Sequence, residues 1–261
     1  MQSFWLMVSL VACKQGDVNL FTVEDDMRLG ADLAAQIDAD PVNFPPLDRS
    51  DHPTAYGHLE RIRDEVLDSP HVRYASEFPW EITILDDDDV VNAFAVPGGH
   101  LWVYSGLIRF LESEDQLAGV LGHEIAHADR RHSTEQLTKR YGVSVLLELA
   151  FGDDPNLAAE IAAGLVDLSF SRTQESEADD YSVIYLCDSV YAADGAAGFF
   201  ELSEGGQGVP AFLSTHPNPA RRIEAIHALA EELGCSTEPA PDADYEAVVS
   251  SLDKIEPAPT P

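Results

Sequence analysis

His123, Glu124 and His127 form a His-Glu-x-x-His pattern, the spacing in this sequence that is most clearly suited to chemistry. On a helix, residues four positions apart lie on one face, so both imidazoles can reach a single metal ion. Glu124 directly follows the first histidine, where its carboxylate can act as a general base on water without binding the metal. The pattern therefore predicts one Zn²⁺ ion per chain and a hydrolytic reaction.

A catalytic zinc needs a third protein ligand, and the best candidates lie between Arg172 and Asp179. Glu175 and Asp179 are one turn apart on a predicted helix, so one can bind the metal while the other accepts a hydrogen bond from a ligating imidazole. Glu177 points about 200° around the helix from Glu175, so these two cannot both face the metal. Spacing alone does not decide which carboxylate is the ligand.

The elements that must position these residues follow from apolar periodicity. The histidine pattern lies on the clearest predicted helix, which starts at Ser113, with Ser113 and Gln116 as a capping box. Alternating residues predict strands at 80–85, 90–96 and 100–104. Further helices are expected at 23–37, 51–68, 106–111, 133–150, 155–170, 172–190, 194–204, 217–233 and 243–255. The predicted fold class is α+β: mostly helical, with a small sheet whose edge strand lies beside the metal helix.

Four segments carry a family resemblance. They are residues 92–107, residues 121–127 with Arg131-His132, residues 171–179, and residues 214–217 with 221–223. In this order they resemble the HtpX and CAAX-prenyl-protease superfamily of HExxH zinc peptidases, and look closest to its soluble periplasmic members of the BepA and LoiP kind. Four ordered segments are far more specific than the histidine pattern alone. The resemblance implies a gluzincin-type metallopeptidase domain.

The resemblance also implies roles for individual residues. Glu175 is expected to be the third zinc ligand, beside the two histidines of the pattern, with Asp179 supporting a ligating imidazole. Glu124 and His216 are the expected catalytic residues, and His216 is expected near the metal, where it caps the open position or helps to hold the oxyanion. Arg172 is expected to support the ligands. The alternatives are a surface ion pair for Arg172 and an ordinary histidine at a helix start for His216.

Composition excludes several classes of protein. The chain has 261 residues, of which 47 are acidic and 15 basic, and its formal net charge is −32. With 45% hydrophobic residues it is too apolar for a disordered protein. No apolar run reaches the roughly 18–20 residues of a membrane-spanning helix. The acidic balance argues against nucleic acid as a partner, since phosphate contacts need clustered Lys and Arg.

The first residues predict a location. A short apolar run ends in Leu10-Val11-Ala12-Cys13, which resembles a bacterial lipoprotein signal. Residues 1–12 are then a signal peptide, and Cys13 is the lipidated first residue of the mature chain, its only membrane contact. The expected location is the cell envelope or periplasm, with the outer membrane favoured because Lys14 follows Cys13. The alternative is a buried N-terminal segment with an ordinary cysteine, because no Lys or Arg precedes the run.

The remaining chain divides into three parts. Residues 13–50 are expected to be a linker with one helix, 51–235 the metallopeptidase domain, and 236–261 an acidic, proline-rich and loosely structured tail. Cys187 and Cys235 can pair in an oxidising compartment or remain buried thiols, and the sequence favours neither.

These patterns predict a zinc-dependent metalloendopeptidase of the bacterial cell envelope that hydrolyses peptide bonds in unfolded or misassembled proteins. An extended substrate is expected to add as a strand near Gly98-Gly99, and this mode of binding recognises the backbone. The alternative is a zinc-containing binding or chaperone module with latent protease activity. The sequence leaves open the natural substrate, the oligomeric state and whether His216 keeps the enzyme latent.

Overall fold

Three strands form the sheet in the part of the chain that the structure describes. This computed structural model describes residues 21–152, 154–165, 167–205, 211–216, 219–240 and 245–253, so the predicted signal segment and Cys13 lie outside it. The strands are β1 (Ile82–Leu85), β2 (Ala93–Ala95) and β3 (Leu101–Tyr104). They lie in the order β1-β3-β2, with β1 parallel and β2 antiparallel to β3. β2 is therefore an edge strand.

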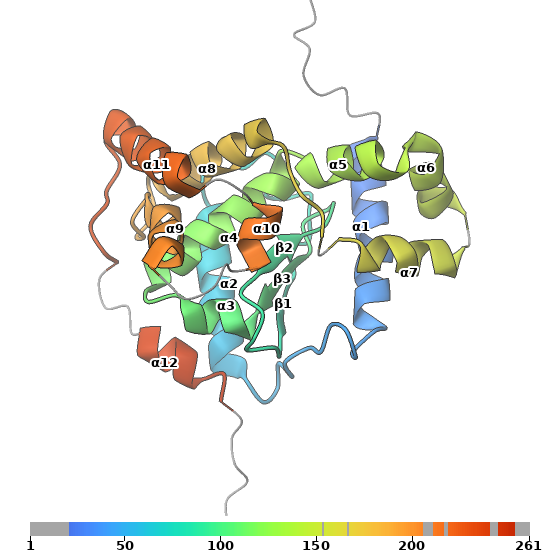
Figure 1. The fold of residues 1–261 in the computed structure, drawn as a ribbon, viewed down its shortest axis with the longest axis horizontal. Coiled ribbons are helices and arrows are strands. Elements are labelled where there is room, and N and C mark those ends of the chain that lie inside the picture. Colours follow the sequence, from blue (N-terminus) through green and yellow to red (C-terminus); the bar gives the residue numbers. More distant parts are fainter. Residues whose placement is uncertain are drawn as a thin grey trace, which may run out of the picture.

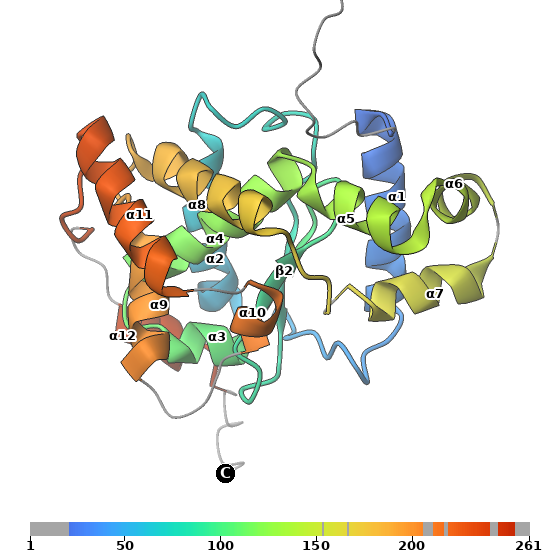
Figure 2. The same cartoon turned by 45° about the horizontal axis from the view of Figure 1, so that its top comes forward.

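Helices cover both sides of this sheet (Figures 1 and 2). In chain order they are α1 (Val23–Asp38), α2 (Pro53–Leu67), α3 (Ser105–Phe110), α4 (Glu114–Asp129), α5 (His132–Tyr141), α6 (Val143–Phe151), α7 (Pro155–Ala163), α8 (Arg172–Leu186), α9 (Gly195–Gly205), α10 (Ala211–Thr215), α11 (Pro219–Leu233) and α12 (Tyr245–Ser250). α4 packs against α8 and α9 on one side of the sheet, whereas α1 packs against α6 and α7 on the other. The predicted α+β class, mostly helical with a small sheet, is confirmed.

The alternation of side chains along the strands separates two apolar cores. Ile84 and Val103 face the larger core, which includes residues of α2, α4, α8 and α9. Phe94 and Trp102 face the smaller core, which includes residues of α1, α6 and α7. Because successive strand residues point to opposite faces, a buried strand needs apolar residues at every position, as β3 has.

Two of the predicted helices are interrupted or shortened at glycines, and one observed helix was not predicted. The expected helix 133–150 is broken into α5 and α6 at Gly142, which has a φ of +84°. The expected helix 155–170 stops at Ala163, with Gly164 as its C-cap. Residues 168–170 then run without regular structure toward the site. The short helix α10 was not predicted at all, because five residues are too few to show a helical period.

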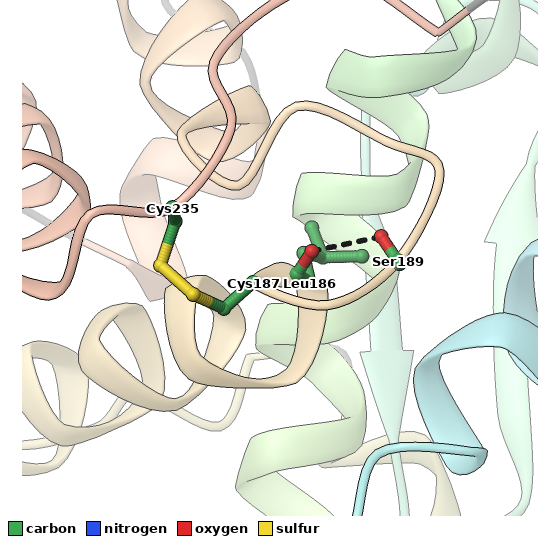
Figure 3. The surroundings of a disulfide bond; sticks show 4 residues. All are labelled: Leu186, Cys187, Ser189 and Cys235. Atoms are coloured by element: carbon green, nitrogen blue, oxygen red, sulfur yellow. Dashed lines mark hydrogen bonds between the residues drawn. A yellow bond between two sulfur atoms is a disulfide. The ribbon is translucent and has the colours of Figure 1, made fainter.

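The C-terminal segment is attached to the domain where the structure describes it. Cys187 and Cys235 form a disulfide that joins the end of α8 to the residues just after α11 (Figure 3). Further along, the hydroxyl of Tyr245 donates to the carbonyl of Ile108 at 2.7 Å, and Tyr245 is buried. The described residues 245–253 are thus held against the domain by a buried aromatic ring, and the helix expected at 243–255 is present as the shorter α12.

Candidate metal centre

The helix α4 brings the histidine pattern into the middle of the domain. The Oγ of Ser113 accepts a hydrogen bond from the amide of Gln116 at 3.2 Å and caps the helix. The side chain of Gln116 turns instead to the amide of Glu112, so the predicted capping box is only half formed. Every residue from Leu117 to Asp129 is buried. The polar side chains of the pattern must therefore find their partners inside the protein.

Three of the predicted ligands converge on one point. His123 Nε2 lies 3.0 Å from His127 Nε2. Each of these nitrogens lies 3.6 Å from a carboxylate oxygen of Glu175. Donors held tetrahedrally around zinc at about 2.0–2.1 Å lie about 3.3 Å from one another. The separations of the three donor atoms thus fit a zinc ion.

The orientation of α8 shows which of two carboxylates, Glu175 or Glu177, faces the donor atoms. It begins with a complete capping box between Ser171 and Gln174, which fixes the direction of its first turn. Glu175 on this turn is buried against the histidines. Glu177 points to the other side, where its carboxylate contacts Arg130 at 3.2 Å and His132 at 3.5 Å. Only Glu175 of this pair lies among the donor atoms.

Neighbouring side chains orient the two imidazoles. Asp179 Oδ1 lies 3.0 Å from His123 Nδ1, on the side of the ring away from the other donors. His127 Nδ1 lies 3.1 Å from His132 Nδ1, which is also buried. Contacts to the second ring nitrogen fix the tautomer and the ring orientation of a ligating histidine. Asp179 is therefore placed to keep the Nε2 of His123 free for a metal.

Arg222 of α11 completes this group, although no role was predicted for it. Its Nε and Nη2 atoms donate to the two carboxylate oxygens of Asp179, each at 2.6 Å. Its Nη1 lies 2.7 Å from Glu175 Oε2. The only sequence signal was its place in the segment 221–223 that carries the family resemblance. A buried guanidinium here balances two buried carboxylates, which would otherwise be costly.

His216 enters from the end of α10, between the donors and the general base. Its Nδ1 lies 3.1 Å from His123 Nε2 and 3.0 Å from Glu175 Oε1. Its Nε2 lies 3.5 Å from Glu124 Oε1. The ring stacks on Phe212, with the centroids 4.1 Å apart. His216 thus offers a fourth donor to the same point, and all four donor atoms lie within 4.8 Å of one another.

The electrostatics of the site suit a cation. Burial lowers the pKa of His123 and, still further, that of His127, so both rings are neutral and present lone pairs. Burial opposes ionisation of Glu175, but His216 and other cationic neighbours hold the pKa of its carboxyl below the ordinary value. Two neutral imidazoles and one carboxylate are a donor set typical of catalytic zinc. The residues present therefore fit this ion.

Glu124 has the properties of a general base. Burial raises the pKa of its carboxyl to about 7, near the value at which proton transfer is most efficient at neutral pH. Its Oε1 is buried and has no hydrogen-bond partner among the described residues. A hollow of only about 10 Å³ lies beside it, lined by Phe170, His216 and the edge of β2. This hollow has room for about one water molecule.

Arg172 was expected to support the ligands, and neither that support nor the alternative surface ion pair is seen among the described residues. It forms no hydrogen bond or ion pair to His123, His127 or Glu175. It lines a cavity between α8 and α11 instead, together with Arg221.

Comparisons with known proteins show the family of this chain. The sequence profile of peptidase family M48 matches residues 53–230. The chain is 31% identical to the mitochondrial metalloendopeptidase OMA1 of Schizosaccharomyces pombe, over 67% of this chain and 52% of that relative. It is 31% identical to metalloprotease YcaL of Escherichia coli, over 52% and 57% of the two chains. It is 34% identical to a Vibrio cholerae protein named as a candidate beta-barrel assembly-enhancing protease, over 52% and 32%. The chain thus matches about half or less of the length of most of these relatives.

These relatives correct the predicted location. Similar proteins from fission yeast, Arabidopsis thaliana, budding yeast, cattle, human and zebrafish are named as mitochondrial metalloendopeptidases. The prediction of a lipid-anchored protein of the cell envelope or periplasm is therefore wrong, because it rested on the first residues and not on the domain that the relatives share. In the described part of the chain, every helix is too short or too polar to cross a bilayer.

Proposed function

Because the chain belongs to peptidase family M48, we propose that it is a zinc-dependent metalloendopeptidase that cleaves unfolded or misassembled polypeptides. The observation that carries the proposal is the convergence of His123, His127 and Glu175, with the Oε1 of Glu124 beside them and without a hydrogen bond among the described residues. Two neutral imidazoles and a carboxylate at these separations are what zinc requires, and the base is close to the ligands without being one of them.

The residues of the chain divide the reaction between them. A bound zinc ion would supply Lewis acidity for the scissile carbonyl and the attacking water. Glu124 takes the proton of that water, for which a pKa of about 7 is suited, and returns it to the leaving nitrogen. His216 Nε2 lies 3.5 Å from Glu124, where a protonated ring can help to hold the developing oxyanion.

The edge strand β2 favours substrates without a fixed structure. It pairs with β3 on one side, and the hollow beside Glu124 lies along its other side. An extended polypeptide can add to such an edge through its main-chain groups, whatever its side chains are. A folded protein cannot offer an extended segment without unfolding. This supports a role in protein quality control.

The position of His216 favours a second candidate, a binding module with latent protease activity. Its Nδ1 takes the place of a fourth donor, which in a catalytic zinc site is left for water or substrate. The hollow of about 10 Å³ does not admit a peptide. In this arrangement cleavage requires α10 and His216 to move away from the donors.

Cleavage of casein by the zinc-loaded full chain tests both candidates, with Glu124→Gln and His216→Ala measured at matched zinc content. We expect Glu124→Gln to retain zinc and to lose about 10²–10⁴-fold in turnover, because only the proton transfer is removed. Cleavage that appears only in His216→Ala would establish latency. If neither the unmodified chain nor either variant cleaves casein although zinc is bound, the chain is a binding module.

A further inference from the structure

A cavity of about 240 Å³ lies between the first turns of α8 and α11. These helices are neighbours in both views of the fold (Figures 1 and 2). Glu175 and Asp179 form part of the cavity wall, so the cavity borders one proposed zinc ligand and the carboxylate that orients another. Arg172, Asp180 and Arg221 form its exposed side.

The charges around the cavity do not balance locally. Arg222 is neutralised by Asp179 and Glu175. Arg172 and Arg221, in contrast, form no ion pair or hydrogen bond with any other described residue. Asp180 is the remaining carboxylate of the wall, and it stands against two unpaired guanidinium groups. The open side, with Arg172, Arg221 and Asp180, therefore carries a formal excess of one positive charge, while the lining as a whole, with three arginines and three carboxylates, is formally neutral.

Among the described residues, four of the twelve arginines have no ion pair, and two of these four line the cavity. With 47 acidic and 15 basic residues, an arginine easily finds an acidic neighbour. Most described arginines do so; these are Arg28, Arg49, Arg61, Arg63, Arg109, Arg130, Arg131 and Arg222. Arg172 and Arg221 are exceptions, and both line one cavity beside the metal centre. This placement points to an acidic partner from outside the chain.

We infer that Arg172 and Arg221 bind a carboxylate of the polypeptide substrate, and that this cavity is a specificity site of the peptidase. The inference rests on the proposed function. A guanidinium group matches a carboxylate with two parallel hydrogen bonds, which neither a neutral amide nor an apolar side chain can form. The carboxylate is an acidic side chain near the scissile bond or the free C-terminus of the substrate. The edge strand β2 then binds the main chain of the substrate, while the cavity selects for a carboxylate at one position of the substrate.

Peptide binding tests the inference without cleavage. The protein is the zinc-loaded full chain with Glu124→Gln and His216→Ala, so that peptides are neither cut nor excluded by His216. One peptide series has an amidated C-terminus and carries Glu or Gln at each position in turn. A second series compares the free with the amidated C-terminus of a neutral peptide. Further variants add Arg172→Gln, Arg221→Gln or the control Arg73→Gln, which removes another exposed arginine whose side chain forms no ion pair among the described residues; its backbone amide donates to Asp129 and is unaffected.

We expect one acidic peptide to bind about tenfold more tightly than its neutral counterpart, as a charge-assisted pair at a partly exposed site allows. The series in which the preference appears identifies the source of the carboxylate. Arg172→Gln and Arg221→Gln should each reduce the preference to about twofold or less, whereas Arg73→Gln should leave it at about tenfold. Equal binding of acidic and neutral peptides, no binding of either, or a preference that survives both substitutions would overturn the inference. Casein cleavage by the unmodified chain is independent of these results, so a failure of the proposed function is recognised separately.

Discussion

At the scale of single residues, Glu175 and Glu177 test the assignment of the ligands. They are two positions apart on α8, yet only Glu175 is buried beside the histidines. We expect Glu175→Ala to lose much of its zinc, since the substitution removes the one anionic donor and leaves only neutral imidazoles. Glu177→Ala should keep about one zinc ion per chain. Zinc per folded chain, measured by atomic emission after gel filtration, distinguishes the two. The opposite pattern would show that the ligand is Glu177.

The sequence could predict some of these residues but not others. His123, Glu124 and His127 follow from the geometry of one helix, which spacing reveals. The choice between Glu175 and Glu177 depends on how α8 is turned against α4, and no periodicity within α8 contains this information. Arg222 has a role only because it lies beside Asp179, which is distant in the sequence but 2.6 Å away in space. Long-range charge pairing of this kind leaves no local pattern.

At the scale of elements, Gly119 controls how closely α4 approaches α9. A Cβ atom on Gly119 would lie 2.0 Å from the backbone nitrogen of Ala196, whereas a Cβ on Gly57 of α2 would have nothing within 4 Å. Replacing an exposed helical glycine with alanine stabilises a protein by about 0.5–1 kcal/mol, so we expect this gain for Gly57→Ala. Gly119→Ala should instead lower the free energy of unfolding by about 1–3 kcal/mol or more, because two backbones must separate.

Urea unfolding of the two alanine variants measures this difference. Both substitutions have the same intrinsic effect on a helix, so a difference in sign can come only from the contact between α4 and α9. Equal effects would mean that the two helices are not in close contact at Gly119.

His227 links α11 to α9 in a way that depends on pH. Its Nδ1 lies 2.9 Å from Asp194 and its Nε2 3.3 Å from Glu201, so only the protonated ring can donate to both. Burial opposes the charge, but the hydrogen bonds to Glu201 and Asp194 prevail and raise the pKa of His227. A raised pKa means stability that is complete below the unfolded pKa of about 6.5 and lost as the pH rises through the folded pKa.

We therefore expect His227→Gln to cost more stability at about pH 5.5 than at about pH 9. The difference should stay below about 1 kcal/mol, because the side chain of His227 is 45% exposed and water screens the pairs. Urea unfolding at both pH values gives the comparison, with His71→Gln as the control, since His71 is an exposed histidine without a described ion pair. A cost that is equal at both pH values, or larger at high pH, would contradict this assignment.

At the scale of the whole molecule, the two cores show what the sequence could not supply. Strand alternation and helical periodicity were enough to predict the α+β class and the helix that carries the histidines. The smaller core joins α1 to α6 and α7, which are more than a hundred positions apart in the chain. The sequence of each of these helices predicts an apolar face, but it does not identify the helix against which that face packs. For the same reason, the sequence could not predict the contact between α8 and α11 that forms the arginine-lined cavity.

The net charge of −32 acts on a substrate long before the cavity does. At about 0.01 M salt the Debye length is about 30 Å, so the whole acidic surface repels an approaching polyanion; at about 0.15 M it is about 8 Å. At low salt, kcat/KM should therefore be about tenfold or more higher for a basic unfolded protein than for an acidic one of equal length. This difference in kcat/KM should decrease as salt is added. A short peptide without net charge serves as the control, since its kcat/KM should change little. A carboxylate bound between Arg172 and Arg221 has a different signature, since its benefit is confined to one position of the substrate. If instead the acidic protein is cleaved as fast as the basic one at low salt, the surface charge does not govern encounter, and local contacts alone select the substrate.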